Sequence, residues 1–206
     1  DHIKLVAYPF PEGMAIPRLM PFQEFPWNGD GYLAAEVLRL KEAHGLTMAI
    51  ETGTCLGSTT CWLAENFDNV APIETNGAFL DIAYARTNCY AGRIRFFHDD
   101  SVKVLRKSTA TGLFFLDAHW GANCPLLDEL DAISKIGGTP VVLIHDFQVP
   151  GTDFGFDKMP DGRHFNIDLI RTHLDAIYGE GGWKHNYPTN VEGARRGWIS
   201  IEPVHP

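Results

Sequence analysis

Short apolar segments alternate with helical patterns through the middle of this chain. Apolar runs bounded by turn residues predict strands at residues 47–52, 70–75, 94–99, 112–117 and 140–146. Helical patterns lie between most of them, for example at residues 58–66, 77–90, 101–107 and 124–135. Strands that alternate with helices form a parallel sheet covered by helices on both faces. The chain is therefore predicted to be an α/β protein with a Rossmann-like, doubly wound sheet.

The two ends of the chain differ from this middle part. Residues 1–29 hold five prolines and several aromatic side chains, which predicts an N-terminal arm or lid packed on the body. Residues 30–206 are predicted to form a single domain, whose first helix starts at Asp30 and stops at Gly45. A loop rich in Gly, Pro and Asp precedes a last helix and two strand patterns. We expect these two strands to give the mostly parallel sheet an antiparallel C-terminal edge.

Pro72 lies inside the second predicted strand, in the segment NVAPIET. Proline lacks the backbone N–H that a central strand donates to its neighbour. We therefore expect this strand to begin at Pro72 or to carry a bulge.

Composition narrows the range of partners. The sequence has 26 acidic side chains, 17 Lys and Arg, a formal net charge of −9, and no run of more than two basic residues. A chain without a basic stripe is a poor candidate for binding nucleic acid or anionic lipid, so a small-molecule partner is expected. Its four cysteines show no C-x-x-C spacing, and no apolar run approaches 18 residues. These features predict reduced thiols and a cytoplasmic location, and they leave open whether the chain forms a homo-oligomer.

A glycine-bearing turn joins the first predicted strand to a helix, in the segment IETGTCLGSTT. Its glycines, Gly53 and Gly57, are spaced G-x-x-x-G, so it is neither a Walker loop, which needs a lysine, nor a G-x-G-x-x-G dinucleotide fingerprint. Glu51, just before the turn, repels phosphate and suits a ligand that carries an ammonium group. Taken alone, the turn is also compatible with a plain strand-to-helix connection whose glycines allow close packing.

Acidic residues end the next two strands. Glu74 is placed to accept both hydroxyls of a ribose, and Asp100 and Ser101 can bind the edge of an adenine. Each acid taken singly is more often solvated, but the carboxyl ends of parallel strands converge on one crevice. The ligand indicated by this set has an amine, a ribose and an adenine but no phosphate, as S-adenosylmethionine (SAM) does.

With these motifs the chain resembles class I SAM-dependent methyltransferases, closest in pattern to the catechol O-methyltransferase-like group. The segments GLFFLDAHW and GGTPVVLIHDFQVPGTDF match that group's fourth and fifth strands, and the resemblance covers roughly residues 30–155. It implies a doubly wound methyltransferase fold with SAM as cofactor. The predicted cofactor-binding residues are Glu51, Gly53, Thr54, Gly57, Ser58, Thr59, Glu74, Asp100, Ser101, Asp117, His119 and Trp120.

The resemblance also implies a metal site. In that group two aspartates, here Asp117 and Asp146, bind Mg²⁺ together with an adjacent Asn, and a lysine serves as base. This sequence has Phe147 at the Asn position and Gly121 at the lysine position.

Two histidines stand beside the aspartates and offer alternatives. Asp117, His119, His145 and Asp146 are the predicted catalytic residues, either as a mixed metal site for Mg²⁺ or another divalent ion, or with one histidine as a general base. A third alternative is that they only position the reactants.

The predicted function is SAM-dependent methylation of a small molecule, at oxygen, with or without help from a divalent metal. The alternatives are a non-catalytic SAM-binding module and, with less support, an NAD or nucleotide-sugar Rossmann enzyme. In the segment PLLDELDAI, the acids Asp128, Glu129 and Asp131 are expected to form a solvated helix face.

Overall fold

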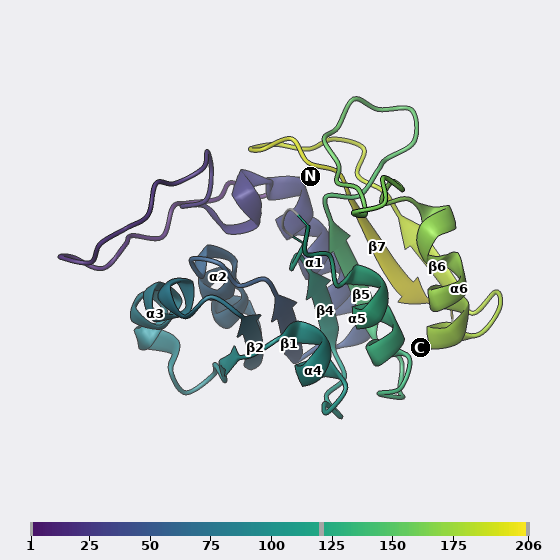
Figure 1. Cartoon of the computed structure of the whole chain (residues 1–206), viewed down its shortest axis with the longest axis horizontal. Coiled ribbons are helices and arrows are strands. Elements are labelled where there is room, and N and C mark those ends of the chain that lie inside the picture. Colours follow the sequence, from purple (N-terminus) through teal and green to yellow (C-terminus); the bar gives the residue numbers. More distant parts are fainter. Residues whose placement is uncertain (1, 120–121, 205–206) are drawn as a thin grey trace.

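A computed structural model describes residues 2–119 and 122–204. One sheet with the strand order β3-β2-β1-β4-β5-β7-β6 runs through the centre of the molecule (Figure 1). Its strands are β1 (Met48–Thr52), β2 (Asn69–Glu74), β3 (Phe97–His98), β4 (Leu113–Leu116), β5 (Val141–His145), β6 (Trp183–Asn186) and β7 (Trp198–Pro203). Strands β1 to β5 are parallel, whereas β7 is antiparallel to both β5 and β6. The predicted doubly wound sheet with an antiparallel C-terminal edge is confirmed.

Helices cover both faces of the sheet. They are α1 (Gly31–His44), α2 (Ser58–Asn66), α3 (Gly77–Arg86), α4 (Ser101–Leu105), α5 (Leu126–Ile133) and α6 (Ile167–Tyr178), with short 3-10 helices η1 (Pro26–Gly29) and η2 (Asn88–Tyr90). One hydrophobic core joins α4, α5 and α6 to one face of the sheet, and a second joins α1 and α2 to the other. As predicted, α1 begins at the capping side chain of Asp30 and ends at Gly45, which has a left-handed backbone.

The strand order reverses direction between β1 and β4. The chain proceeds from β1 outward through β2 to β3, returns to β4 on the other side of β1, and continues outward through β5. In an open α/β sheet, ligands bind beyond the carboxyl ends of the strands that flank such a reversal. The fold therefore predicts a ligand site at the residues that follow Thr52 in β1 and Leu116 in β4.

The prediction for Pro72 was wrong. Strand β2 starts three residues earlier and passes through Pro72, which pairs with Glu51 of β1. Val70 bonds to Arg93 and Arg95 on the β3 side, but the next β2 residue on that side is Pro72, which has no N–H. The ladder breaks there and resumes in the register it had before, which a bulge would have shifted. Strand β3 is accordingly much shorter than predicted.

The expectation of a fully solvated acidic face on α5 was also wrong. Asp128 and Asp131 are exposed, but Glu129 is only 1% exposed. The buried stripe of α5 is centred on Leu126, Leu130 and Ile133, and residue 129 falls on the same side of a 3.6-residue helix. Burial raises the pKa of Glu129 to about 7.

The N-terminal arm packs on the body through buried groups. The Trp27 indole is 2% exposed and meets the rings of Trp62 and Phe115 edge-on, at centroid distances of 5.1 and 4.9 Å. The buried guanidinium of Arg86 donates to the carbonyls of Tyr8 in the arm and Leu56 in the glycine turn, both at 2.6 Å. Contacts of this kind tie the start of the chain to the turn that follows β1.

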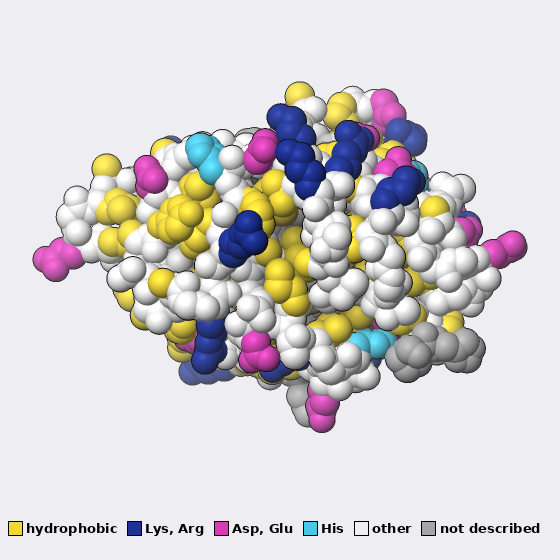
Figure 2. All heavy atoms as spheres, turned by 90° about the horizontal axis from the view of Figure 1, so that it is seen from below, with side chains coloured by type: hydrophobic (Ala, Val, Ile, Leu, Met, Phe, Trp, Pro, Cys, Tyr) yellow, Lys and Arg dark blue, Asp and Glu magenta, His cyan; other side chains and the backbone are white. Residues whose placement is uncertain are grey.

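The surface carries charges of both signs. On the face seen in Figure 2, the described Lys and Arg side chains are mixed with acidic, hydrophobic and uncharged surface and form no continuous stripe. Within the two described stretches of chain, no helix combines the length and apolar character needed to cross a membrane.

Candidate active site

Two adjoining cavities lie at the carboxyl ends of the parallel strands. The larger cavity has a volume of about 560 Å³ and the smaller about 290 Å³. Among the described residues, four line both of them: Gly53, Cys55, Asp117 and His119. Because these residues follow β1 and β4, the cavities meet at the point where the strand order reverses.

Gly53 brings the glycine turn against the end of β4. Its φ is +78°, and a Cβ atom there would lie 2.8 Å from the Ala118 Cα and closer still to the Asp117 carbonyl oxygen. The amides of Gly53 and Thr54 both donate to the carbonyl of Ile73, at 3.1 and 3.3 Å. Only glycine allows the turn to approach both neighbouring strands so closely.

Gly57 serves helix packing. It caps the start of α2 with φ +77°, and a Cβ atom there would lie 2.8 Å from the Ala83 Cβ in α3. Gly57 does not line either cavity in the described part of the chain, although the sequence motif placed it among the cofactor-binding residues. Its neighbours Ser58 and Thr59 do line the larger cavity, and their hydroxyls bind the backbone of Gln23 and Trp27 in the arm.

Glu51 is a buried carboxyl group in the wall of the larger cavity. It is 1% exposed and accepts a 2.5 Å hydrogen bond from the Thr60 hydroxyl. Burial raises the pKa of Glu51 to about 8, and the negative charge of Asp117 adds to this effect. A cationic ligand in the cavity would supply the positive charge that favours the ionised form of this group.

The smaller cavity contains the predicted ribose and adenine side chains. Glu74 accepts hydrogen bonds from the amides of Cys55 and Asn76, both at 2.8 Å, so the turn fixes its carboxylate. Asp100 caps α4 by accepting from the amide of Lys103, and Ser101 follows it. Glu74, Asp100, Ser101, Asn76 and Phe79 all line this cavity.

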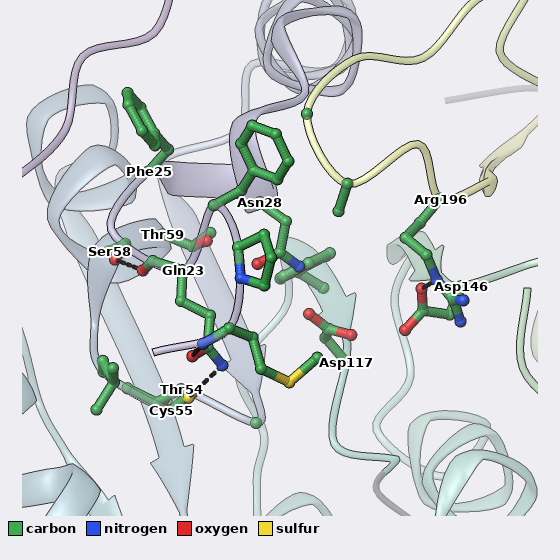
Figure 3. Close-up of a pocket in the computed structure, with 18 of the residues that line it drawn as sticks. Gln23, Phe25, Asn28, Thr54, Cys55, Ser58, Thr59, Asp117, Asp146 and Arg196 are labelled. Atoms are coloured by element: carbon green, nitrogen blue, oxygen red, sulfur yellow. Dashed lines mark hydrogen bonds and ion pairs between the residues drawn. The ribbon is translucent and has the colours of Figure 1, made fainter. Parts of the chain in front are cut away.

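The four predicted catalytic residues form one cluster. His119 Nε2 lies 3.2 Å from Asp146 Oδ2 and 3.7 Å from Asp117 Oδ1. His145 Nδ1 lies 3.2 Å from Asp117 Oδ1 and 3.5 Å from Asp146 Oδ1. Asp117, His119 and Asp146 line the larger cavity, whereas His145 is buried behind the two carboxylates and does not reach it. In Figure 3, Asp117 lies between Cys55 on one side and Asp146 on the other.

The charges in this cluster support one another. Burial by itself would raise the pKa of Asp146, but the charge of His145 and the hydrogen bond to His119 outweigh it and hold that pKa well below its usual value. Burial opposes the protonated form of His119, yet the hydrogen bond to Asp146 and the charge of Asp117 raise its pKa above 6.5. The pKa of His145 is raised in the same way by both carboxylates.

Arg196, which the sequence did not single out, completes the cluster. Its Nε donates to Asp146 Oδ1 (Figure 3). Its Nη2 donates to Asp157 Oδ1. Arg196 lies 50 residues from Asp146 along the chain. In the sequence, Arg196 stands out only as half of the pair Arg195–Arg196. This pair does not indicate that Arg196 contacts Asp146.

The metal prediction has partial geometric support. One donor atom each from Asp117, His119 and Asp146 lies within 4.8 Å of the others, a spacing that a metal ion can bridge. Phe147, at the position of the family's third ligand, is fully buried in the core. Trp120 and Gly121, which were a predicted adenine contact and the position of the family's lysine, lie outside the described residues.

The N-terminal arm and the β6–β7 connection form the outer wall of the larger cavity. The lining residues from these two segments are Met20, Pro21, Phe22, Gln23, Phe25 and Asn28 in the arm and Gly193, Ala194, Arg195 and Arg196 in the connection. The segments touch directly, since the Ala194 amide donates to the Asn28 carbonyl and a Cβ on Gly193 would overlap that carbonyl.

No protein-family model and no curated protein matches the sequence. Solved structures do match the fold. An O-methyltransferase from Bacillus cereus in complex with SAH aligns with a TM-score of 0.61 and 16% identity over 83% of this chain and 80% of that one. The O-methyltransferase TomG from Streptomyces achromogenes, in complex with SAM, aligns with a TM-score of 0.60 and 15% identity over 84% of this chain and 80% of that one.

An amino pentose methyltransferase from Micromonospora echinaspora with SAM bound also aligns, with a TM-score of 0.53 and 14% identity over 83% of this chain and 89% of that one. These similarities confirm the predicted class I methyltransferase fold. At such identities the fold is what the chains share, and activity has to be argued from the residues of the site.

Proposed function

We propose that this chain is a SAM-dependent methyltransferase that methylates a hydroxyl group of a small molecule. The observation that carries the proposal is the meeting of the two cavities at Gly53, Asp117 and His119. The smaller cavity offers groups that suit a nucleoside, and the larger one holds a proton-accepting cluster. One ligand that runs through both would bring its reactive group to that cluster.

The smaller cavity suits the nucleoside end of SAM. Each carboxylate oxygen of Glu74 accepts one backbone amide and keeps a further lone pair for a ribose hydroxyl. Asp100 and Ser101 offer an acceptor and a hydroxyl for the adenine edge, and Phe79 offers an apolar surface for its ring. Across the shared wall, Glu51 provides the carboxylate that the ammonium of the methionine tail requires. The SAM and SAH complexes among the fold relatives support this assignment.

The cluster suits proton removal from a hydroxyl. The cofactor supplies an electrophilic methyl group on a sulfonium, and the protein has to align the acceptor and take its proton. In our proposal His119 accepts the hydroxyl proton at Nδ1, because Nε2 donates its own proton to Asp146, while the oxygen–carbon bond forms and the sulfur–carbon bond breaks to leave a thioether. Asp146 and Asp117 then stabilise the imidazolium, because both carboxylates face Nε2.

The outer wall of the larger cavity supports a small acceptor. Aromatic and apolar residues of the arm, such as Phe22 and Phe25, line the same cavity as the polar cluster. We propose that residues 20–28 of the arm cover the acceptor and so act as its lid. The division into an arm at residues 1–29 and a catalytic domain at residues 30–206 is part of this proposal.

Calorimetric titration of the purified chain with SAM, SAH and NAD tests the cofactor assignment. We expect SAM and SAH to bind and NAD to give no heat. Glu74→Gln should weaken SAM binding by about tenfold or more, because hydrogen bonds to a charged group contribute about 1.5–3 kcal/mol. Glu42→Gln, at an exposed position of α1, is the matched control and should bind SAM as the wild type does.

Turnover separates an enzyme from a non-catalytic SAM-binding module. SAM should be converted to SAH in the presence of a panel of hydroxylated acceptors, and His119→Gln should abolish the conversion while SAM still binds. SAM binding without SAH formation on any acceptor would favour the module. Binding of NAD in place of SAM would favour a nicotinamide-dependent enzyme and refute the proposal.

A further inference from the structure

We propose that the guanidinium of Arg196 takes the place of a divalent cation at the ends of β4 and β5, so that methyl transfer by this chain needs no metal. Arg196 is thereby a positioning residue, which holds Asp146 and through it orients His119. This inference rests on the proposed function, because His119 is taken as the group that accepts the proton.

The side-chain contacts give Arg196 two anionic partners. Nε donates to Asp146 and Nη2 donates to Asp157, so the planar guanidinium bridges the two carboxylates in the cavity wall. Charge-assisted hydrogen bonds from a rigid, permanently charged group fix the direction of a carboxylate. Asp146 can then present its other oxygen, Oδ2, to His119 Nε2 at 3.2 Å.

The backbone holds Arg196 in this place. The Phe147 amide donates to the Gly197 carbonyl at 2.9 Å, and the amides of Gly155 and Gly197 donate to the carbonyls of Arg195 and Gly155 at 2.9 and 2.8 Å. These bonds attach the residues around Arg196 to the segment that follows β5. The backbone of Arg196 is therefore fixed beside the segment that follows β5, and the two carboxylates fix its side chain.

The backbone at Asp146 and Gly155 also helps to hold Arg196 in this place. Asp146 has φ +55°, a left-handed conformation that non-glycine residues seldom adopt, and its carbonyl accepts from the Asp157 amide at 2.8 Å. A Cβ on Gly155 would lie 3.0 Å from Nη1 of Arg196, so a glycine there leaves room for the guanidinium. The segment from residue 146 to residue 157 is thus folded around Arg196.

A divalent ion does not fit this donor set while Arg196 is in place. It would bind between Asp117, His119 and Asp146, but it would have to break the hydrogen bond between His119 and Asp146, and the charge of Asp146 is already paired with Arg196. The ion would also lie beside the positive guanidinium, which repels it. Phe147 offers no oxygen ligand, since its side chain is an apolar ring packed in the core.

Electron paramagnetic resonance of Mn²⁺ tests this inference without relying on turnover. We expect the wild-type chain to leave the signal of free Mn²⁺ unchanged. Arg196→Met removes the charge but keeps much of the side chain's length, and it should bind Mn²⁺ at least about tenfold more tightly than the wild type. Asp117→Asn in the Arg196→Met background should remove that binding. Arg163→Met is the control, because Arg163 pairs with Asp161 at the surface and lines neither of the two cavities.

Two further measurements keep the inference falsifiable. If Arg196→Met does not fold, Arg196→Lys is used; it retains a positive charge and should still exclude Mn²⁺. Wild-type turnover should be unchanged by EDTA. Mn²⁺ binding to the wild type as tight as to Arg196→Met, or loss of wild-type turnover in EDTA that Mg²⁺ restores, would overturn the inference. Failure to bind SAM would instead refute the proposed function, and the Mn²⁺ comparison would still decide the role of Arg196.

Discussion

Gly53 packs against the backbone of Asp117 so closely that a Cβ atom on Gly53 would overlap the Asp117 carbonyl oxygen. The turn after β1 and the end of β4 are thus fixed relative to each other by main-chain contact. A change in the turn therefore alters both cavities and the position of Asp117 together, because Gly53 and Asp117 line both cavities.

Replacing Gly53 by Ala should destabilise the chain and weaken SAM binding by about tenfold or more, since the turn has to move away from Asp117. Gly45→Ala is the matched control. Gly45 also has positive φ, +58°, but within the described residues no atom lies within 4 Å of the place its methyl group would take. For this control only the backbone strain of about 1 kcal/mol applies. Thermal melts and SAM titrations of both variants give the comparison. Normal SAM binding by Gly53→Ala would contradict the role of this contact.

The rate of methyl transfer should rise with pH. The cluster raises the pKa of His119 above 6.5, and only the neutral imidazole can accept a proton, so the rate increases as His119 loses its proton. The midpoint is expected above pH 6.5 in a profile of kcat measured at saturating SAM. A kcat that falls as pH rises through this range would show that His119 acts as an acid, or not at all.

SAM binding near pH 7 should release a proton from Glu51. Burial raises the pKa of this carboxyl group to about 8, so it is mostly protonated at pH 7, and a neighbouring ammonium group favours the ionised form. Titration calorimetry in buffers of different ionisation enthalpy measures the release. Glu51→Gln keeps the shape of the protonated group and should bind without releasing the proton. Equal release by both proteins would assign the proton to another group.

Trp27 should contribute strongly to stability through its ring and little through its N–H. Trp27→Ala is expected to cost about 3–5 kcal/mol because it leaves a cavity between Trp62 and Phe115. Trp27→Phe should cost clearly less than Trp27→Ala, since it keeps an aromatic ring in place and the indole Nε1 has no hydrogen-bond partner among the described residues. Denaturant unfolding of both variants provides the values. Similar losses for the two would contradict the assignment to ring packing.

Sequence periodicity was sufficient wherever a structural role depends on neighbours along the chain. The carboxyl ends of the parallel strands, the cap at Asp30 and the stop at Gly45 follow from local patterns, and the structure has them close to where they were expected. The same reasoning failed for Glu129, because this residue lies on the same side of α5 as the buried Leu126, Leu130 and Ile133. It also could not tell that Gly57 packs on Ala83 and leaves the cavity lining to Gly53.

The sequence by itself determined the sheet and the convergence of Glu51, Glu74, Asp100 and Asp117 at its carboxyl edge, because parallel strands bring their ends together whatever connects them. Only the tertiary structure decided that His145 stays behind the carboxylates and that Arg196 pairs with Asp146. That pair depends on the antiparallel return of β7 beside β5, which sets residues 50 positions apart side by side. A contact of this kind has no period and no spacing that a sequence pattern could reveal.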